Sequence, residues 1–489
     1  MKSVAALTLL ALAARVVHIE YKSLNGGDEP YSLALAQRPL FDMLELFGYE
    51  ANGMLYSLVL WPLVRISESE AMLRAPAALA GIASVPALWW AGRTLVNERV
   101  GLVAAALLAV SPTAIWYSQL ARPFAFVILF SILSFPLLVA ALERDGGWRW
   151  AAYVAVMVGA AYSNTFACLV LLPAHLLLAR GHAGGVRRWV RSLFVLAITL
   201  LPLAALLVVE RLQRDPLYWL ERATPKSVGI AMVELTTGFS NLKIVAVAIV
   251  LVTVAAVVWL VLHLRRSGEP APREFAVIAA WALLPGLILI AVIAPVFRSP
   301  YFIGCLPGIL LGTAVALDRM PRRAALAGLV VLLALQVGAA VWQTTRQVSE
   351  TWRSAMAWVD DQRRPGDPLI LDIAAVLPVL GYYDDTYRAP DGDLVVHEWG
   401  DRPMPRGVLP YDDPGGYGGT VGPPTRATIA RLARGDRRLI VVLAEYVEAL
   451  QGDVPNSPGL RWARRECTVS RRQEFQIELF AVTGCPAQP

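Results

Sequence analysis

The chain has 489 residues, of which 56% are hydrophobic and only 17% are charged. Water-soluble domains usually carry about a quarter charged residues, so the composition excludes a single soluble globule. Residues 346–489 hold 17 basic and 20 acidic side chains, so the net charge of +6 comes from the apolar remainder. Basic residues in such a setting are typical of cytoplasmic loops rather than of a nucleic-acid surface, and we expect no nucleic-acid partner.

Residues 1–345 have the composition of a domain embedded in a bilayer. A spanning helix needs roughly 17–25 mostly apolar residues, and eleven segments predict one, although the sixth is short. They lie near 3–19, 74–92, 100–117, 124–142, 150–166, 167–179, 192–209, 244–263, 275–294, 301–317 and 324–342. No small-residue cleavage site follows the first segment, so we predict a membrane span there rather than a signal peptide.

The connecting loops fall into two kinds that alternate along the chain. One kind is rich in arginine: Arg93 and Arg99; Arg144 and Arg149; Arg180, Arg187, Arg188 and Arg191; Arg265, Arg266 and Arg273; Arg319, Arg322 and Arg323. The other kind comprises 20–73, 118–123, 163–166, 210–243 and 295–300. Because basic loops stay on the cytoplasmic side, we expect a multi-pass protein of the cytoplasmic membrane with a cytoplasmic N-terminus and an extracytoplasmic 346–489 segment.

The apolar stretch Met54–Ile66 has about 13 residues, which suits an interfacial helix better than a span. We therefore interpret 20–73 as one large outer loop that carries interfacial helices. Residues 346–489 predict a small α/β domain. Its helix starts near Trp352 and ends before Pro365-Gly366, and its strands lie near 368–373, 438–443 and 474–482.

The four cysteines show no metal-binding spacing. Cys168 and Cys305 lie in apolar runs, where a small core residue is the simplest interpretation. Cys467 and Cys485 both lie in the C-terminal segment, and a bridge between them is open to an extracytoplasmic domain.

The outer loop opens with Asn25-Gly26-Gly27-Asp28-Glu29-Pro30, which places two adjacent carboxylates at the outer end of the first span. Acidic residues at a membrane boundary indicate a functional site. A structural role competes with this interpretation, because Asp28 also suits the N-cap of a helix over 30–37 with proline in its first turn.

Three further outer segments carry polar residues in an apolar setting. They are Trp116–Phe124 with Tyr117 and Arg122, Tyr162–Phe166 with Asn164, and Phe297–Phe302 with Arg298 and Tyr301. Guanidinium groups on the same side of the membrane as an acidic pair suit a phosphate-bearing ligand. The alternative for each arginine is an anchor at the membrane interface.

Together these segments resemble a known family. The runs GGDEPYSLALAQRPL (26–40), ANGMLYSLVLW (51–61) and Glu68–Phe126 look like bacterial family 39 glycosyltransferases, relatives of protein O-mannosyltransferases and aminoarabinose transferases with the GT-C architecture. Weaker similarity occurs at YSNTF, RSPYF and TWRSAMAWVDDQRRPGD. Relatives usually read YSQEAR where this chain has YSQLAR, so Leu120 replaces a commonly acidic residue.

The resemblance implies a mainly α polytopic membrane protein of the GT-C type, which takes a sugar from a polyprenyl-phosphate donor outside the membrane. It also implies that Asp28 is the catalytic base. An inverting sugar transfer needs one base for the acceptor hydroxyl, and positive charge or hydrogen-bond donors for the departing phosphate. We assign Asp28 to the first role.

Glu29, Tyr117, Arg122, Asn164, Arg298 and Tyr301 are the candidate donor- and acceptor-binding residues. A divalent cation near Asp28 is left open, because no ligand cluster in the sequence demands one. The expected partners are the polyprenyl-phosphate sugar, membrane lipid, and a glycan, lipid or protein acceptor.

Two other classes of protein compete with a glycosyltransferase. A transporter or flippase of a lipid-linked sugar would also place arginines and carboxylates at the membrane face. Transporters often carry charges within their spans and contain inverted repeats, and we find no repeated half in this chain. A membrane-anchored binding protein would keep its function in residues 346–489. The identities of the sugar and of the acceptor stay open.

Overall fold

The computed structural model describes most of the chain. The described residues are 2–25, 28–45, 53–144, 146–205, 208, 224–240, 242–267, 272–292, 299–346, 351–364, 366–371, 377–384, 394–396, 425–435, 437–444, 457–474 and 477–486. The chain forms two compact units. The first contains 1–19, 47–63 and 71–346, and the second contains 20–46, 64–70 and 347–489.

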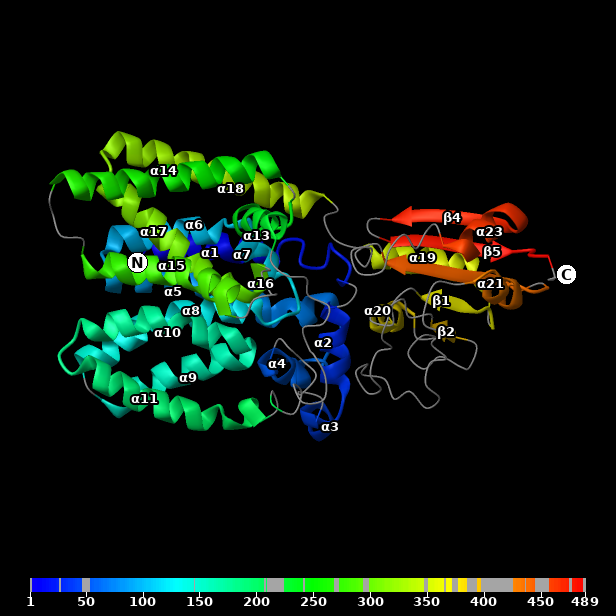
Figure 1. Cartoon of the computed structure of the whole chain (residues 1–489), viewed down its shortest axis with the longest axis horizontal. Coiled ribbons are helices and arrows are strands. Elements are labelled where there is room, and N and C mark those ends of the chain that lie inside the picture. The colour runs from blue at the N-terminus through cyan, green and yellow to red at the C-terminus, as the bar shows by residue number, and fades with distance from the viewer. Residues whose placement is uncertain are drawn as a thin grey trace. The chain divides into compact units, whose positions relative to one another are not determined.

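The first unit is helical, and its helices lie alongside one another (Figure 1). They are α1 Lys2–Val16, α4 Leu55–Leu63, α5 Glu70–Leu95, α6 Glu98–Ala109, α7 Pro112–Ser118, α8 Phe124–Glu143, α9 Gly147–Ser163, α10 Thr165–Arg180, α11 Gly185–Thr199, α13 Pro225–Thr237, α14 Lys243–Ser267, α15 Arg273–Val292, α16 Ser299–Phe302, the 3₁₀ helix η2 Ile303–Cys305, α17 Leu306–Arg319 and α18 Arg322–Thr345. Each span that the sequence predicted overlaps at least one of these helices.

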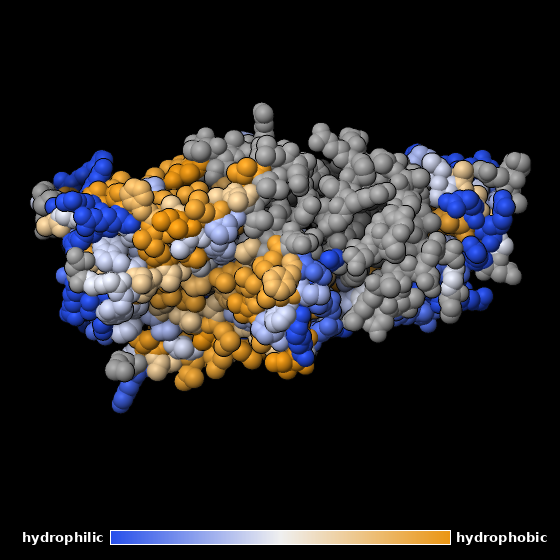
Figure 2. Space-filling model, turned by 90° about the horizontal axis from the view of Figure 1, so that it is seen from below, coloured by the Kyte–Doolittle hydropathy of each residue, from blue (hydrophilic) through white to orange (hydrophobic). Residues whose placement is uncertain are grey.

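Apolar surface indicates how this unit meets a membrane. Large hydrophobic side chains on α14 and α18 are exposed, among them Leu251, Val254 and Val330. Figure 2 shows hydrophobic residues covering much of the visible helical surface. In the described part of the chain, five helices are long and apolar enough to cross a membrane, and a sixth qualifies if the bent pair α6 and α7 is one span. The number eleven therefore stays a prediction.

The span predicted at 100–117 is broken rather than continuous. Helices α6 and α7 meet at an angle of 62°. Proline disfavours a helical conformation in the residue before it and is well placed at the start of a helix, so Ser111-Pro112 ends α6 and begins α7. The Ser111 side chain caps α7 by accepting the Ala114 N–H.

A buried arginine closes the break between these helices. Arg15 of α1 is fully buried, and its guanidinium donates to the carbonyl oxygens of Leu108 and Ala109 at 3.1 and 3.0 Å. Its Nε donates to Ser118 Oγ at 3.3 Å. In return, Gln119 Nε2 donates to the backbone oxygen of Arg15 at 3.1 Å. Carbonyl groups at helix ends have no hydrogen-bond partner within their own helix. Here Arg15 of α1 supplies donors to the end of α6, and Gln119 after α7 supplies a donor to the end of α1.

A second polar chain lies between apolar helices. Trp189 Nε1 can only donate, and it donates to Tyr153 Oη at 3.0 Å. The Ser134 proton goes to the Ser131 carbonyl oxygen. Ser134 Oγ therefore accepts from His175 Nε2–H at 3.0 Å, and His175 Nδ1 accepts the Tyr153 hydroxyl. This order assigns the neutral Nε2–H tautomer of His175.

The second unit contains a five-stranded sheet in the order β2-β1-β3-β5-β4. Strand β1 pairs in parallel with β2 and β3, while β5 pairs antiparallel with β3 and β4. Its elements are α2 Asp28–Gln37, α3 Leu40–Glu45, α19 Trp352–Gln362, β1 Leu369–Leu371, α20 Leu377–Tyr383, β2 Leu394–Val396, α21 Arg426–Leu432, β3 Leu439–Ala444, α23 Pro458–Glu466, β4 Thr468–Glu474 and β5 Ile477–Thr483.

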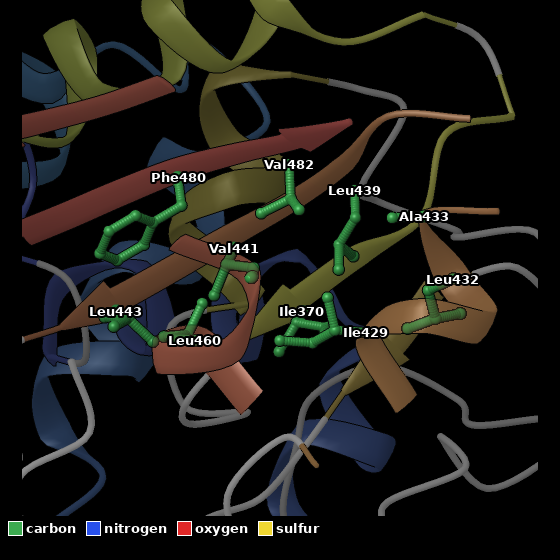
Figure 3. Packing of buried hydrophobic residues seen from close by; sticks show 11 residues of the cluster. Ile370, Ile429, Leu432, Ala433, Leu439, Val441, Leu443, Leu460, Phe480 and Val482 are labelled. Atoms are coloured by element: carbon green, nitrogen blue, oxygen red, sulfur yellow. The ribbon is translucent and has the colours of Figure 1, made fainter. Parts of the chain in front are cut away.

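Both faces of the sheet are covered. On one face, Val441 and Phe480 pack against Ile429 of α21 and Leu460 of α23 (Figure 3). Helix α19 packs against β5, and Val442 on β3 is also fully buried. Strands buried on both faces appear in a sequence as continuous apolar runs, which explains why β1 and β3 were predicted. Strand β5 was predicted from an alternating pattern over 474–482.

Strand β4 was not predicted, because the edge strand Thr468–Glu474 is mostly polar and exposed. Arg471 of this strand pairs with Glu478 of β5, whose side chain is buried. A disulfide joins Cys467 to Cys485, so the bridge that the sequence left open is formed in the structure.

Candidate functional site

The two carboxylates of the outer loop lie in different environments. Helix α2 begins at Asp28 itself, so the N-cap position that the sequence suggested for Asp28 is corrected to the first helical turn. Asp28 is exposed, whereas Glu29 is only 1% exposed. Glu29 Oε2 accepts the N–H of Asn25 at 2.9 Å, and the N–H of Glu29 donates to the Asn25 carbonyl oxygen at 3.3 Å. Glu29 therefore fixes the entry to α2, and Asp28 is the carboxylate that faces outward.

In the first unit, the segment around Tyr117 contacts the segment that begins at Ser299. Tyr117 Oη lies 3.2 Å from Ser299 Oγ. Ser299 Oγ donates to the carboxylate of Glu234 on α13. Because the Ser299 proton goes to Glu234, the Tyr117 hydroxyl donates to Ser299. Sequence positions more than 180 residues apart are joined by this chain.

The short helix α16 is the point where several predicted segments meet. It contains Tyr301, which is 6% exposed, and it packs against α10 and α13. Asn164 caps α10, because its Oδ1 accepts the N–H of Phe166 at 3.1 Å. The Nδ2 of this buried amide has no hydrogen-bond partner among the described residues. It can therefore donate to a ligand oxygen.

Arg122 follows a tight turn in which its N–H donates to the Leu120 carbonyl oxygen at 2.7 Å. The residue is 5% exposed. An interface anchor keeps its charged end in contact with water or head groups, so burial favours a role inside the protein. Arg298 lies outside the described residues, and the structure adds nothing to its predicted role.

Gly53 brings the outer loop close to the turn before α10. Its φ of +80° lies in the left-handed region, and a Cβ added there would stand 2.4 Å from the Tyr162 carbonyl oxygen. Only glycine fits this position without displacing the turn. The segment that begins at Gly53 and the segment YSNTF are therefore neighbours in the fold.

The spans also enclose an apolar cavity of about 640 Å³. It is lined by residues of α13, α14, α15, α17 and α18, and its few polar groups include Thr253, Thr313 and Gln336. Gln336 Oε1 is buried and has no partner in the described part of the chain. A cavity of this size and character suits a hydrocarbon chain.

Three polar residues that sequence reasoning did not select are Glu234, Glu70 and Tyr383. Each is part of a hydrogen-bond cluster in the structure. Glu234 lies on α13, within the segment 210–243 that the sequence predicted to be an outer loop, and this is the sequence signal that could have drawn attention to it. Within the described ranges, no group of three or more His, Cys, Asp or Glu side chains is arranged to hold a metal ion.

Comparison with known proteins places the fold. Residues 52–210 match the model of the dolichyl-phosphate-mannose-protein mannosyltransferase family. No curated protein matches the chain. The structure is similar to the crystal structure of ArnT from Cupriavidus metallidurans in the apo state, with a TM-score of 0.63 and 13% identity over 98% of this chain and 97% of that one.

ArnT from the same organism bound to undecaprenyl phosphate is similar to the same degree, with a TM-score of 0.62, 12% identity, and coverage of 98% of this chain and 97% of that one. The apo oligosaccharyltransferase of Archaeoglobus fulgidus gives a TM-score of 0.52 at 10% identity, over 93% of this chain and 71% of that one. The chain thus has the fold of GT-C membrane glycosyltransferases. The resemblance to this class that the sequence predicted is confirmed.

Proposed function

We propose that this protein is an inverting glycosyltransferase of the cytoplasmic membrane. It moves a sugar from a polyprenyl-phosphate donor to a hydroxyl group of a glycan, lipid or protein acceptor on the outer face. The observation that carries the proposal is the ArnT-like fold over nearly the whole chain, in combination with an exposed Asp28 beside a buried Glu29. One of the similar ArnT structures holds undecaprenyl phosphate, which supports a lipid-phosphate donor for this chain.

The carboxylates of Asp28 and Glu29 have different roles in this reaction. Asp28 is exposed and takes the proton of the acceptor hydroxyl as that oxygen attacks the anomeric carbon. Glu29 is buried and accepts a backbone N–H, so it orients the first turn of α2 rather than reacting. The leaving group is a phosphate, which departs as an anion and needs no proton from an acid.

Positive charge and hydrogen-bond donors stabilise this departing phosphate. We assign that role to Arg122 and Arg298, with the Asn164 amide as a further donor. A planar guanidinium binds phosphate through two parallel hydrogen bonds, which lysine cannot reproduce. We further propose that the apolar cavity between α13, α14, α15, α17 and α18 takes part of the polyprenyl chain.

The direct test replaces Asp28 with asparagine, which keeps the shape of the side chain and removes the base. The full-length protein is reconstituted in liposomes with polyprenyl-phosphate-linked hexose and pentose donors and a cell-envelope extract as acceptor. The readout is the release of polyprenyl phosphate, which is common to every sugar and every acceptor. We expect Asp28→Asn to lower turnover by at least about 10²-fold, because general base catalysis supplies about 10²–10⁴-fold. Donor affinity should not change.

Asp42→Asn is the matched control. Asp42 is an exposed aspartate in the first turn of α3, within the same outer loop. This variant should keep wild-type turnover. Near-normal release by the Asp28→Asn protein would make Asp28 structural. Movement of the intact donor across the bilayer without any release would favour the flippase instead.

The placement of the reaction on the outer face is tested separately. Arg461 of α23 is exposed, so a cysteine at this position is accessible in the folded protein. An impermeant maleimide should label Arg461→Cys in intact cells. Labelling that requires lysis would place residues 346–489 in the cytoplasm and would contradict an outer active site.

A further inference from the structure

A buried carboxylate joins several segments of the second unit. Glu70, the first residue of α5, is only 5% exposed. Its Oε1 accepts the hydroxyl of Tyr383 at 2.6 Å, and its Oε2 accepts Nη2 of Arg353 at 2.5 Å. Tyr383 ends α20 and Arg353 lies in the first turn of α19, so residues of the C-terminal segment provide both partners.

The same cluster holds the chain that leads into α2. The Tyr383 hydroxyl oxygen accepts the N–H of Leu24 at 2.9 Å, and Arg353 also donates to the carbonyl oxygen of Glu20 at 3.1 Å. The next N–H along the chain, that of Asn25, is bound by Glu29. These backbone groups lie outside regular secondary structure, so their positions depend on such side-chain partners.

The direction of the hydrogen bonds is determined by chemistry. Arg353 can only donate and the carboxylate of Glu70 can only accept, so the Tyr383 proton points at Glu70. The oxygen of Tyr383 is then left to accept the Leu24 N–H. Burial and the neighbouring Glu70 both raise the pKa of Tyr383, so its hydroxyl keeps this proton throughout the physiological range. Consecutive bonds of this kind strengthen one another.

We propose that Tyr383, held by Glu70, is a positioning residue for Asp28. Its hydroxyl holds the backbone N–H of Leu24 in place. The hydrogen bond from the Asn25 N–H to Glu29 then holds the first turn of α2, and Asp28 begins that turn. The C-terminal segment is then a working part of the transferase and not a separate binding module. This inference rests on the proposed function, because it concerns the placement of the base.

The test compares two neighbouring tyrosines in the full-length protein. Tyr383→Phe removes the hydroxyl and leaves the ring in place. Tyr382→Phe is the matched control, because the Tyr382 hydroxyl donates to the Glu68 carbonyl oxygen at 3.0 Å. Each variant removes one hydroxyl of the same unit. Tyr383→Phe loses two hydrogen bonds and Tyr382→Phe loses one, so both should melt below wild type and Tyr383→Phe should melt slightly lower.

We expect Tyr383→Phe to lower kcat for polyprenyl phosphate release by about fivefold, since a hydrogen bond is worth about 1 kcal/mol and a tenfold change corresponds to about 1.4 kcal/mol. The donor KM should stay within about twofold, because the phosphate contacts are untouched. Tyr382→Phe should keep wild-type kcat. Glu70→Gln should resemble Tyr383→Phe, and the double variant should lose less than the product of the two single effects.

The outcomes separate this inference from the proposed function. If Asp28→Asn is inactive and Tyr383→Phe has the same kcat as Tyr382→Phe, the positioning role is wrong and the transferase assignment stands. If Asp28→Asn retains turnover, the assigned base is wrong, and so is the positioning role that depends on it. A drop in kcat for Tyr383→Phe that is matched by Tyr382→Phe would also overturn the inference, because it would report general destabilisation.

Discussion

Gly81 tests the contact between α1 and the broken α6–α7 span. This residue lies inside α5, where alanine normally stabilises a helix relative to glycine by about 1 kcal/mol. At this position an added Cβ would stand 1.9 Å from Ser118 Oγ and 2.9 Å from Arg15 Nε. Gly81→Ala should therefore destabilise the protein, which is opposite in sign to the helix propensity.

The magnitude follows from the groups that must move. Overpacking a dense core costs about 1–3 kcal/mol, and displacing Ser118 from its hydrogen bonds to Arg15 and to the Ala114 carbonyl oxygen costs a further 1–3 kcal/mol or so. After the gain in helix propensity, we expect a net loss of about 3 kcal/mol. For a unit of about 310 residues, with an unfolding entropy of about 2.1 cal/mol/K per residue, that corresponds to a melting temperature about 5 °C lower.

The assay is thermal unfolding of the purified full-length protein, followed by tryptophan fluorescence at a fixed heating rate. Gly338→Ala is the matched control, because Gly338 lies inside α18 and an added Cβ meets no atom within 4 Å. That variant should melt at or slightly above the wild-type temperature. Ser118→Ala in the Gly81→Ala background should recover part of the loss. Equal melting temperatures for the two alanine variants would refute the close packing of Gly81 against Arg15 and Ser118.

Three further predictions concern stability. The Cys467–Cys485 bridge closes a loop over a sequence separation of 18, so its removal should lower the free energy of unfolding by about 3 kcal/mol. Wild type in reductant should melt at the same temperature as the variant with serine at both positions, and a difference between the two would contradict the estimate. Burial and the neighbouring Asp384 raise the pKa of Asp360, so its ionised form is disfavoured in the folded state. Asp360→Asn should therefore stabilise the protein by up to about 0.5 kcal/mol at pH 7, after discounting for solvent screening. This gain should shrink as pH falls through the raised pKa, and a gain that is independent of pH would be inconsistent with it. His175→Leu leaves two buried hydroxyls without their partner and should cost about 2 kcal/mol, measured by the same thermal assay; an unchanged melting temperature would show that the polar chain is dispensable.

Much of the architecture is local and could be predicted from the sequence. The spans are long apolar runs, so helices occur where hydropathy placed them. The apolar runs at β1 and β3 and the alternating run at β5 predicted three of the five strands. The break in the span at 100–117 was missed although Ser111-Pro112 is present, because proline is often tolerated within membrane helices, as Pro136 is within α8.

The candidate site was predictable only as a set of segments. The acidic pair and the three polar turns could be selected because charge and amide groups are rare in an apolar setting. The sequence could not say that Asp28 is exposed and Glu29 buried, because adjacent residues of a helix point in different directions and only packing decides which one meets solvent.

Tertiary structure alone decided the clusters that organise the site. Arg15 meets Ser118 across 103 residues, and Tyr383 meets Glu70 across 313. Neither pair has a local pattern, since a buried polar side chain finds its partner wherever the fold brings one within about 3 Å. Hydropathy determined which segments enter the membrane. The need to satisfy every buried donor and acceptor, which depends on the whole fold, determined which of their polar residues meet.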